Sequence, residues 1–540
     1  MNFIMVMAIL GMAVASAGTA FALTLNNDQA ATSALGQANF TGHLIISTGT
    51  IGLYNPSSVA VDPTSGKVFV ADTAHNRVMR FASLDALSNA AAADGVFGQS
   101  SFYYGEPNTS PGGMNSPQGV VVDSGGRLWV ADTYNNRVLR FDHASSKSNG
   151  AYADGVLGQP DFYSGSMATT RQGMCRPIGV VADFAGRLWV TDTCNGRVLR
   201  FDNAASLANG ANASGVLGKP DFTTPDSYSV SKTAMYQPVG ITVDSMGRLW
   251  VSDRADNRVL RFDNAASLPN GSPATGVLGQ PGFTSSTSAT SQNGMHCPFG
   301  VTIDSSGRLW VADSCNNRVL GFGNVTLLKN GANASIVLGQ MSFAGKVSAA
   351  TAKNMNFPTG VYYSPTADVL WVADSQNNRV LRFGTTEILK NGGFNGYTGS
   401  SSIPSDWTAS NFAVIDGKDT INKKEGLASV KITGSGLVKT LTQTLTYYFQ
   451  GASGDAYVFS FWLKGLNIPT TVGACQGQVL FYSGNTLLAS QTITCPTGTY
   501  NFQNKTISFV LSEYYNKILV KFTYSETAGS VWFDTVSLKK

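Results

Sequence analysis

The sequence predicts an all-β fold in which a six-bladed β-propeller, closed by an N-terminal strand, is followed by a C-terminal β-sandwich. A segment of about 60 residues recurs six times and stops near residue 384, where the chain changes character. The 58 glycines and the charged fraction of 13% are typical of strands joined by many turns. A chain of 540 residues exceeds what one core supports, so we expect at least two domains.

The N-terminus has the pattern of a secretory signal. Residues 1–27 contain no charged side chain, are rich in apolar residues and include the small-residue motif Ala20-Phe21-Ala22. We therefore predict a signal peptide over residues 1–22, with an uncleaved membrane anchor as the alternative. The expected location is extracellular, either secreted or at the cell surface, and membrane contact is expected only through an uncleaved N-terminal segment. Six cysteines suit that oxidising compartment.

The repeat has a fixed period and four strand-like pieces. The stretch "GRLWVADTYNNRVLRFD" (126–142) has counterparts whose aspartates follow at intervals of 60 or 61 residues, and they are Asp72, Asp132, Asp192, Asp253, Asp313 and Asp374. In each unit a proline opens an apolar strand, a glycine turn leads to the second, an asparagine-rich turn leads to the third, and a "GVLGQ" piece ends the unit. Four strands per unit, repeated in series, predict a propeller.

The two ends of the repeat predict how the ring closes. The sixth unit lacks its "VLGQ" piece after Phe383, and an unmatched "ALGQANF" stands at residues 34–40, ahead of the first full unit. The N-terminal strand should therefore complete the last blade, which removes the open edge between the ends. We place the propeller at residues 34–384.

These motifs resemble the NHL-repeat family of six-bladed propellers. The shared signature is Pro-x-Gly-Val, a Val-Asp end, Val-Ala-Asp-Thr, Asn-x-Arg-Val and Phe, and the units here are longer than those of the family. The resemblance implies the fold. It does not imply one function, because the family includes lyases, hydrolases and interaction scaffolds.

Residues present in every repeat are expected to be architectural, and residues that differ between repeats are candidates for function. Asp132, Arg137 and Trp129, with their counterparts, belong to the first class. The candidates for a recognition face on the propeller are Tyr103, Tyr104, Tyr134, Arg254 and Asp256. Neutral drift of loops is the alternative explanation for this variation.

The predicted channel rim carries little catalytic chemistry. The residues after the blade-opening prolines are Ser57, Gln118, Ile178, Val239, Phe299 and Thr359. Peptide-amidating lyases of the family use histidine metal ligands, which this rim lacks, and acidic ligands for calcium are also missing. We therefore expect binding rather than catalysis and no catalytic residue is assigned. An extracellular propeller lyase or hydrolase with a carbohydrate-recruiting module remains an alternative.

The cysteines occur in three pairs that predict disulfides. Cys175 and Cys297 lie near the opening prolines of their blades, while Cys194 and Cys315 each lie two residues after a repeat aspartate. Because the two loops of one blade share a face, we predict the bridges Cys175–Cys194 and Cys297–Cys315. A metal or redox site is the alternative, although the chain contains no CxxC motif. Cys475 and Cys495 are equidistant from a turn near Gly484 and should pair across a hairpin.

Residues 389–540 resemble jelly-roll carbohydrate-binding modules. The resemblance rests on the opening "NGGFNG", the central "YVFSFWLKG", the closing "VWFDTVSL" and the alternation expected of a two-sheet sandwich. Flat rings stack on sugars, so the candidate glycan contacts are Trp462, Tyr482, Trp407, Tyr447 and Tyr448. The alternative is that these rings fill the core. In the family a calcium ion often ties the first strand to the last, which implies a site at Asp534, although Asn395 replaces the usual acid.

The sequence thus predicts a secreted or surface-attached binding protein. The net charge of +4 is small and evenly spread, which argues against nucleic acid as a partner. We expect an extracellular glycan or a cell-surface protein instead. A self-assembling surface-layer or filament subunit is the further alternative.

Overall fold

The computed structural model describes residues 23, 25–83, 89–365, 367–384, 389, 392–398, 401–424, 426–451, 456–471 and 474–539. The predicted signal peptide, residues 1–22, lies outside them. The chain divides into two compact units, Met1–Gly384 and Thr385–Lys540. Over the residues described, none of the helices has the length and apolar character needed to cross a membrane.

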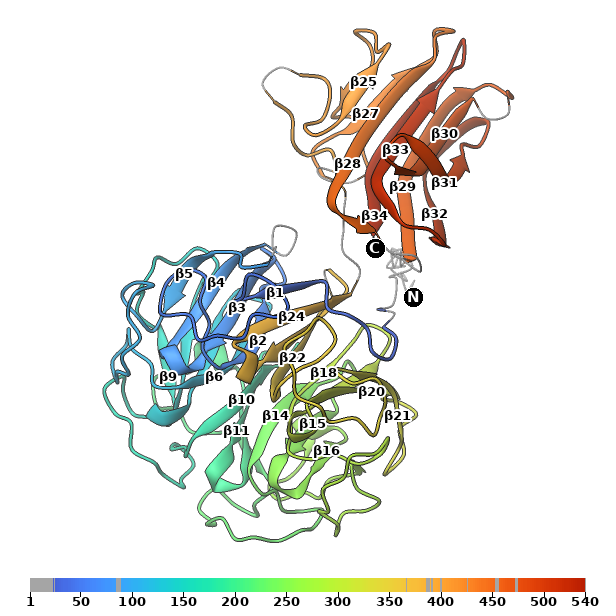
Figure 1. Cartoon of the computed structure of the whole chain (residues 1–540). Helices are drawn as coiled ribbons and strands as arrows, with labels where there is room; N and C mark the ends of the chain where they lie inside the picture. Colours follow the sequence, from blue (N-terminus) through green and yellow to red (C-terminus); the bar gives the residue numbers. More distant parts are fainter. Residues whose placement is uncertain are drawn as a thin grey trace, which may run out of the picture. The chain divides into compact units, whose positions relative to one another are not determined.

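The first unit is a six-bladed β-propeller made of six four-stranded antiparallel sheets (Figure 1). The strands of blades 1 to 3 are β2 (Pro56–Val61), β3 (Lys67–Asp72), β4 (Arg77–Ser83), β5 (Ala93–Phe97), β6 (Pro117–Val122), β7 (Leu128–Asp132), β8 (Arg137–Phe141), β9 (Gly155–Leu157), β10 (Pro177–Ala182), β11 (Leu188–Asp192), β12 (Arg197–Phe201) and β13 (Gly215–Leu217). The strands of blades 4 to 6 are β14 (Pro238–Val243), β15 (Leu249–Asp253), β16 (Arg258–Phe262), β17 (Gly276–Leu278), β18 (Pro298–Ile303), β19 (Arg308–Asp313), β20 (Arg318–Asn324), β21 (Ala334–Leu338), β22 (Pro358–Ser364), β23 (Val369–Asp374), β24 (Arg379–Gly384) and β1 (Ser33–Leu35).

The ring closes as the offset of the repeat predicted. Strand β1 pairs antiparallel with β24, with Ser33 opposite Arg382 and Leu35 opposite Val380. The innermost strands β2, β6, β10, β14, β18 and β22 each contact the next, and β2 contacts β22 (Figure 1). The sixth blade therefore contains strands from both ends of the propeller sequence, and the all-β prediction is confirmed.

A short 3-10 helix joins the second and third strands of each blade. The six are η1 (Thr73–His75), η3 (Thr133–Asn135), η4 (Thr193–Asn195), η6 (Arg254–Asp256), η8 (Ser314–Asn316) and η9 (Ser375–Asn377). Among the described residues, two further 3-10 helices, η5 (Ala204–Ser206) and η7 (Ala265–Ser267), follow the third strands of blades 3 and 4. The residue after η3 is Asn136, which has φ +53°, a left-handed conformation that asparagine tolerates better than most residues. Its side-chain oxygen accepts the backbone N–H of Arg176 at 2.8 Å, so this turn also fastens blade 2 to blade 3.

The repeated tryptophans pack between blades. Trp129 of blade 2 is 2% exposed and lies in one hydrophobic cluster with Val180, Leu188 and Val190 of blade 3. Its indole N–H donates to Asp123 at 3.0 Å, which satisfies the polar end of the ring. The repeat tryptophan is thus an inter-blade contact, as the sequence predicted.

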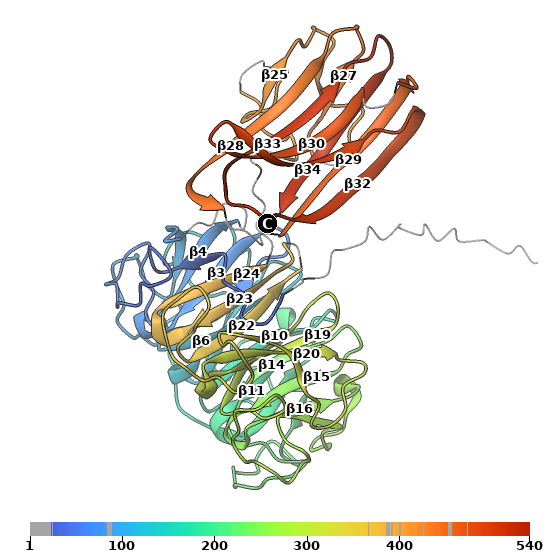
Figure 2. The ribbon, with the colours of Figure 1, turned by 45° about the vertical axis from the view of Figure 1, so that its right-hand side comes forward.

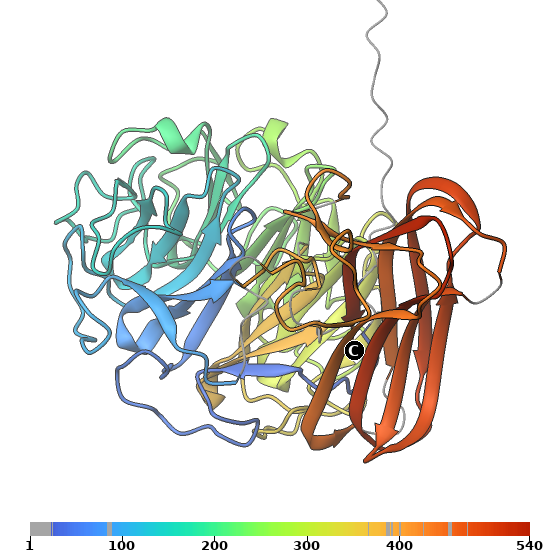
Figure 3. The same cartoon turned by 90° about the horizontal axis from the view of Figure 1, so that it is seen from above.

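The second unit is a sandwich of two five-stranded sheets, and its long strands run side by side in Figures 2 and 3. Sheet A, in order, contains β25 (Thr408–Ser410), β28 (Lys439–Gly451), β33 (Tyr515–Tyr524), β30 (Cys475–Ser483) and β31 (Thr486–Thr494). Sheet B contains β26 (Gly417–Asp419), β27 (Ser429–Thr433), β34 (Ser530–Lys539), β29 (Ala456–Ile468) and β32 (Gly498–Val510).

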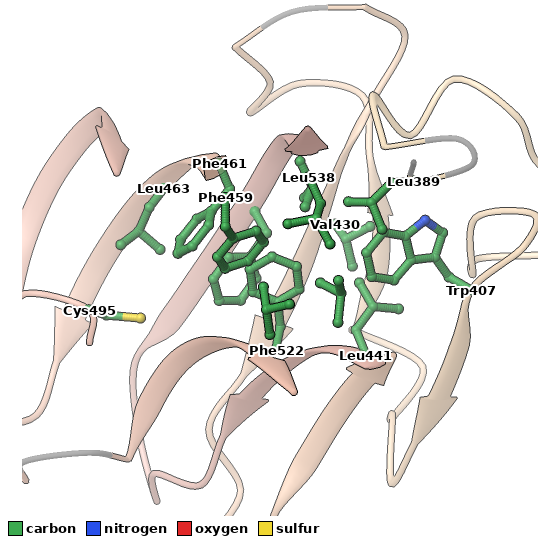
Figure 4. Packing of buried hydrophobic residues seen from close by; sticks show 14 of the residues in the cluster. Leu389, Trp407, Val430, Leu441, Phe459, Phe461, Leu463, Cys495, Phe522 and Leu538 are labelled. Carbon is green, nitrogen blue, oxygen red and sulfur yellow. The ribbon is translucent and has the colours of Figure 1, made fainter. Parts of the chain in front are cut away.

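The facing surfaces of sheets A and B form an aromatic core (Figure 4). Phe459, Phe461 and Leu463 of β29 point into it, in agreement with the alternation in the sequence. Trp407 also belongs to this core, since it is 6% exposed and its ring lies 5.4 Å from that of Phe394. The prediction of Trp407 as a sugar platform was therefore wrong, because packing in the sandwich removes both faces of the indole from solvent.

Candidate functional site

In each blade the repeated Asp and Arg lie at the turn between the second and third strands and form a buried polar cluster. We call this cluster the corner of the blade. In blade 2 the carboxylate of Asp132 accepts Arg137 Nε at 2.7 Å, Asn135 Nδ2 at 2.8 Å and the backbone N–H of Asn115 at 2.6 Å. The side chains of Asp132 and Arg137 are fully buried. Burial raises the pKa of Asp132, and the adjacent Arg137 charge opposes that rise. These residues hold loops and strands together and do not face a ligand.

The corner of blade 4 differs by one residue. Asp256 occupies the place of Asn135, and Arg258 Nη2 lies 3.1 Å from its Oδ2 while Arg258 Nε lies 2.8 Å from Asp253 Oδ2. Burial raises the pKa of Asp253 to about 7, with Arg258 opposing the rise and the Asp256 charge adding to it. Asp256 is fully buried, so its prediction as a surface recognition residue was wrong. The sequence could not separate an exposed from an inward-turned residue in the same turn.

The centre of the propeller is narrow. A channel of about 120 Å³ is lined by inner-strand residues that include Ser57, Gln118 and Phe299. A Cβ atom added to Gly119 would lie 2.1 Å from the carbonyl oxygen of Ile178 in the next blade. The inner strands approach so closely that glycine is required there, and the lining residues carry hydroxyl, amide and apolar side chains.

Three of the predicted propeller-face tyrosines are exposed. Tyr103 is 73% exposed, Tyr104 58% and Tyr134 50%. Tyr134 lies beside a hollow of about 390 Å³, whose other lining residues are Asn136, Gly165, Ser166, Met167 and Arg176. The Arg176 guanidinium lies 5.2 Å from the Tyr134 ring centroid, within cation–π range. Met167 and Arg176 were not predicted, because both lie in loops without a strand pattern.

Arg254, the remaining predicted face residue, is partly buried. Its Nη1 donates to Gln237 Oε1 at 3.2 Å, and its charge acts on the thiols of blade 5. It stands where the other blades carry Thr or Ser in the same turn.

Two of the three predicted disulfides are formed. Cys175 and Cys194 are bonded with Cα atoms 5.4 Å apart, and Cys475 and Cys495 are bonded with Cα atoms 5.3 Å apart. The latter pair closes the open end of the β30–β31 hairpin, as the symmetric spacing predicted.

The third predicted bridge, Cys297–Cys315, is not formed in the structure, where both residues are free and half-buried. Together with His296 their potential ligand atoms all lie within 4.8 Å of one another. A hydrogen bond from Cys315 is the main cause that lowers the pKa of Cys297 to about 6, and the same contact raises the pKa of Cys315. The prediction failed because Cys297 is one residue farther along its loop than Cys175, and His296 occupies the bridging position.

The outer face of sheet B carries Trp462, and a neighbouring segment covers it. Lys424 Nζ lies 4.4 Å from the centroid of the Trp462 ring, and the Lys424 backbone N–H donates to Asp534 Oδ2 at 2.7 Å. On the same face, Lys464 Nζ donates to Asn422 Oδ1 at 2.7 Å. Residues 419–424 therefore lie over this face, and Trp462 is half-buried.

The outer face of sheet A carries two polar rows, with the Leu480–Leu519 pair between them. Paired residues place one row across all five strands, and it consists of Thr408, Thr442, Lys521, Gln478 and Thr492. A parallel row contains Lys517 opposite Tyr482, whose ring centroid lies 4.6 Å from Lys517 Nζ. We call these two rows the sheet A face. Of the five predicted glycan contacts, Tyr482 is the one that lies on it with a described side chain, because the side chains of Tyr447 and Tyr448 lie outside the described residues.

The backbone engages Asp534, the predicted calcium ligand. Its two oxygens accept backbone N–H groups, Oδ2 from Lys424 and Oδ1 from Thr535, each at 2.7 Å. Calcium needs six to eight oxygen ligands, and the described residues place no group of three or more His, Cys, Asp or Glu ligands at Asp534. Asp534 instead anchors the segment that covers sheet B.

Comparison with known proteins supports the propeller. The model for the NHL repeat matches residues 53–81, 114–141, 174–201, 235–262 and 295–322, which lie in blades 1 to 5. The chain is similar to NHL repeat-containing protein 2 of Bos taurus, with 24% identity over 364 residues, covering 60% of this chain and 46% of that protein. A probable peptidyl-alpha-hydroxyglycine alpha-amidating lyase of Caenorhabditis elegans is 26% identical over 166 residues, covering 29% of this chain and 41% of that protein.

The matches thus span less than half the length of these two relatives. Among solved structures, a streptogramin B lyase is similar with 14% identity and a TM-score of 0.38, covering 62% of this chain and 95% of that one. The five repeats and the six four-stranded sheets together establish a six-bladed propeller built from NHL repeats.

Proposed function

We propose that the protein is an extracellular binding protein whose C-terminal sandwich binds a glycan on the sheet A face. The observation that carries the proposal is the contrast between the two outer faces of the sandwich. Residues 419–424 cover the face that carries Trp462, whereas the sheet A face offers hydroxyl, amide and ammonium groups in register across five strands.

The chemistry of the sheet A face suits a sugar. Gln478 Nε2 donates to Thr492 Oγ1 at 3.1 Å, which orients the amide so that its remaining groups can exchange hydrogen bonds with sugar hydroxyls. Tyr482 supplies a flat ring farther along β30, beyond the Leu480–Leu519 pair. Five strands spaced about 4.8 Å apart give a polar row of roughly 19 Å, long enough to contact more than one sugar unit.

Two features support the location and the role of the propeller. The bridges Cys175–Cys194 and Cys475–Cys495 suit an oxidising compartment such as the cell exterior. Tyr103, Tyr104 and Tyr134 offer exposed aromatic area of the kind that protein interfaces use. We assign the propeller to recognition of a protein or ligand partner at the hollow beside Tyr134.

The test is a glycan array probed with the full chain and with two matched variants. Tyr482→Ala should weaken binding at least about tenfold, which corresponds to ~1.4 kcal/mol, while Trp462→Ala should leave binding within about twofold because its ring is covered. Absence of binding to every glycan would overturn the proposal. Loss of binding in Trp462→Ala with binding kept in Tyr482→Ala would move the site to sheet B.

A propeller enzyme is the second candidate, favoured by the similarity of part of the chain to an amidating lyase. Its test is the release of product from a peptidyl-alpha-hydroxyglycine substrate by the full chain. Turnover would support an enzyme, and the narrow channel with its uncharged lining is the reason that we place it second.

A further inference from the structure

The corners of blades 3 and 5 have the same backbone arrangement. In blade 3 the N–H of Cys175 donates to Asp192 at 2.6 Å, and the N–H of Cys194 donates to the Cys175 carbonyl at 3.2 Å. In blade 5 the N–H of His296 donates to Asp313 at 2.7 Å, and the N–H of Cys315 donates to the His296 carbonyl at 3.1 Å. His296 therefore stands in the place of Cys175, and Cys315 in the place of Cys194.

The second thiol of blade 5 comes from the next position. Cys297 has φ +54°, matching φ +48° at Arg176 in blade 3. The two loops therefore share this backbone conformation, and the sulfur of blade 5 comes one residue later than that of blade 3. The substitution of an imidazole and the shift of a sulfur by one residue convert a disulfide corner into a cluster of three metal-ligating groups.

We propose that His296, Cys297 and Cys315 bind a zinc ion. Zinc prefers thiolate and imidazole ligands in a tetrahedral arrangement, and a site with three protein ligands leaves a fourth position for water or a ligand. This site is formed by the loops of blade 5, and its three residues are not among those that line the channel. It does not depend on the proposed glycan binding.

The three ligand atoms need to move only slightly closer together to bind zinc. Zinc–sulfur and zinc–nitrogen bonds of about 2.3 and 2.1 Å place tetrahedral ligand atoms roughly 3.5–3.8 Å apart. The three ligand atoms already lie within 4.8 Å of one another. Shifts of about 1 Å in half-buried side chains complete the site.

The surroundings hold the three ligand residues in place. The two backbone hydrogen bonds described above fix the loop of His296 against the turn of Cys315. Asp313 is committed to the corner, since its Oδ2 accepts Arg318 Nε at 2.6 Å and Asn316 Nδ2 at 2.9 Å. All three ligand residues are half-buried, so the exposed side of the cluster gives an ion an entry path.

The test supplies the full chain with zinc during purification under air and removes unbound ion by gel filtration. Elemental analysis should find about one zinc ion per chain in the wild type and less than about one tenth of that in His296→Ala and Cys315→Ser. His143→Ala is the matched control, because His143 is exposed and lies outside the cluster, and it should keep the ion. Cobalt in place of zinc should give a thiolate-to-metal charge-transfer band in the wild type and in His143→Ala, and no such band in Cys315→Ser.

Thermal unfolding with and without zinc distinguishes a variant that has lost the zinc site from one that has failed to fold. Zinc should raise the midpoint of the wild type and leave that of His296→Ala unchanged, because binding to the native state adds its free energy to stability. A Cys297–Cys315 disulfide found by peptide mapping in the zinc-supplied chain would overturn the proposal. Zinc content equal in the wild type and in both ligand variants would also overturn it.

Discussion

Blades 2 and 4 build the same buried corner, and they differ in how many carboxylates surround the arginine. In blade 2 the amide of Asn135 donates to Asp132, and its own oxygen accepts Thr109 Oγ1 at 2.6 Å. In blade 4 the equivalent of Asn135 is Asp256 and the equivalent of Thr109 is Val230. Neither oxygen of Asp256 accepts a hydrogen bond from the described residues.

The difference teaches that the corner tolerates a second acid only by keeping a proton. A carboxylate has no N–H to donate, so two acids around one guanidinium leave one negative charge uncompensated. Burial raises the pKa of Asp253 to about 7, with Arg258 opposing the rise and the Asp256 charge adding to it. We therefore expect the two acids of blade 4 to make the stability of the protein depend on pH.

We expect the largest effect on the free energy of unfolding when the Asp–Arg ion pair of a corner is broken. Arg137→Met should lower the free energy of unfolding by about 3–5 kcal/mol, because it leaves the fully buried Asp132 carboxylate without its charge partner. Urea unfolding at neutral pH measures the loss. Lys147→Met is a matched control, since Lys147 forms an exposed pair with Asp154, and it should change stability by less than about 1 kcal/mol.

The next largest effect on stability is expected when the second acid of blade 4 is introduced into blade 2. Asn135→Asp should cost about 1–3 kcal/mol at pH 8, because the donor to Asp132 is replaced by a buried acceptor. The cost should shrink as the pH falls toward 4 and one acid of the pair becomes protonated. A loss that stays the same between pH 4 and 8 would contradict this account and indicate a packing effect instead.

The reverse substitution, Asp256→Asn, should remove the repulsion between the two acids of blade 4. The folded-state pKa of Asp253 is raised above its unfolded value, so between pH 4 and 7 the native state holds a proton that the unfolded state has lost. Stability from this group is thus complete below about pH 4 and is lost as the pH rises through about 7. Asp256→Asn should stabilise the protein by about 1–2 kcal/mol at pH 8 and have little effect near pH 4.

The difference in unfolding free energy between wild type and Asp256→Asn, measured across that pH range, tests the relief directly. A difference independent of pH would show that the two acids are not coupled. Asn316→Ala serves as a comparison in blade 5, where the loss of the donor to Asp313 should destabilise at every pH in the range.

The smallest effect on stability is expected when blade 4 is given the hydroxyl group that Thr109 supplies in blade 2. Val230→Thr should place a donor near Asp256, as Thr109 is placed near Asn135, and stabilise by about 0.5–1.5 kcal/mol. Val230→Ala controls for the change in packing. Equal stability of the threonine and alanine variants would show that the hydroxyl does not reach the carboxylate.

The architecture of the propeller follows from local patterns in the amino-acid sequence. The period of the repeat, the four strand patterns and the unmatched piece at residues 34–40 predicted the blades and the closure by β1, because each depends on local alternation and turn residues. The pairing of Cys475 with Cys495 followed for the same reason, since a hairpin register fixes which residues face each other.

The tertiary structure decided which side of each element meets solvent. Trp407 enters the core, Asp256 turns into the corner, and residues 419–424 cover Trp462, all through contacts with residues distant in the sequence. The sequence did not predict a role for His296, because it is one of four scattered histidines and only the fold places it beside two thiols. Burial and the meeting of separate loops depend on the packed chain as a whole, so a local pattern fixes the strand while the packing of its neighbours fixes what the strand exposes.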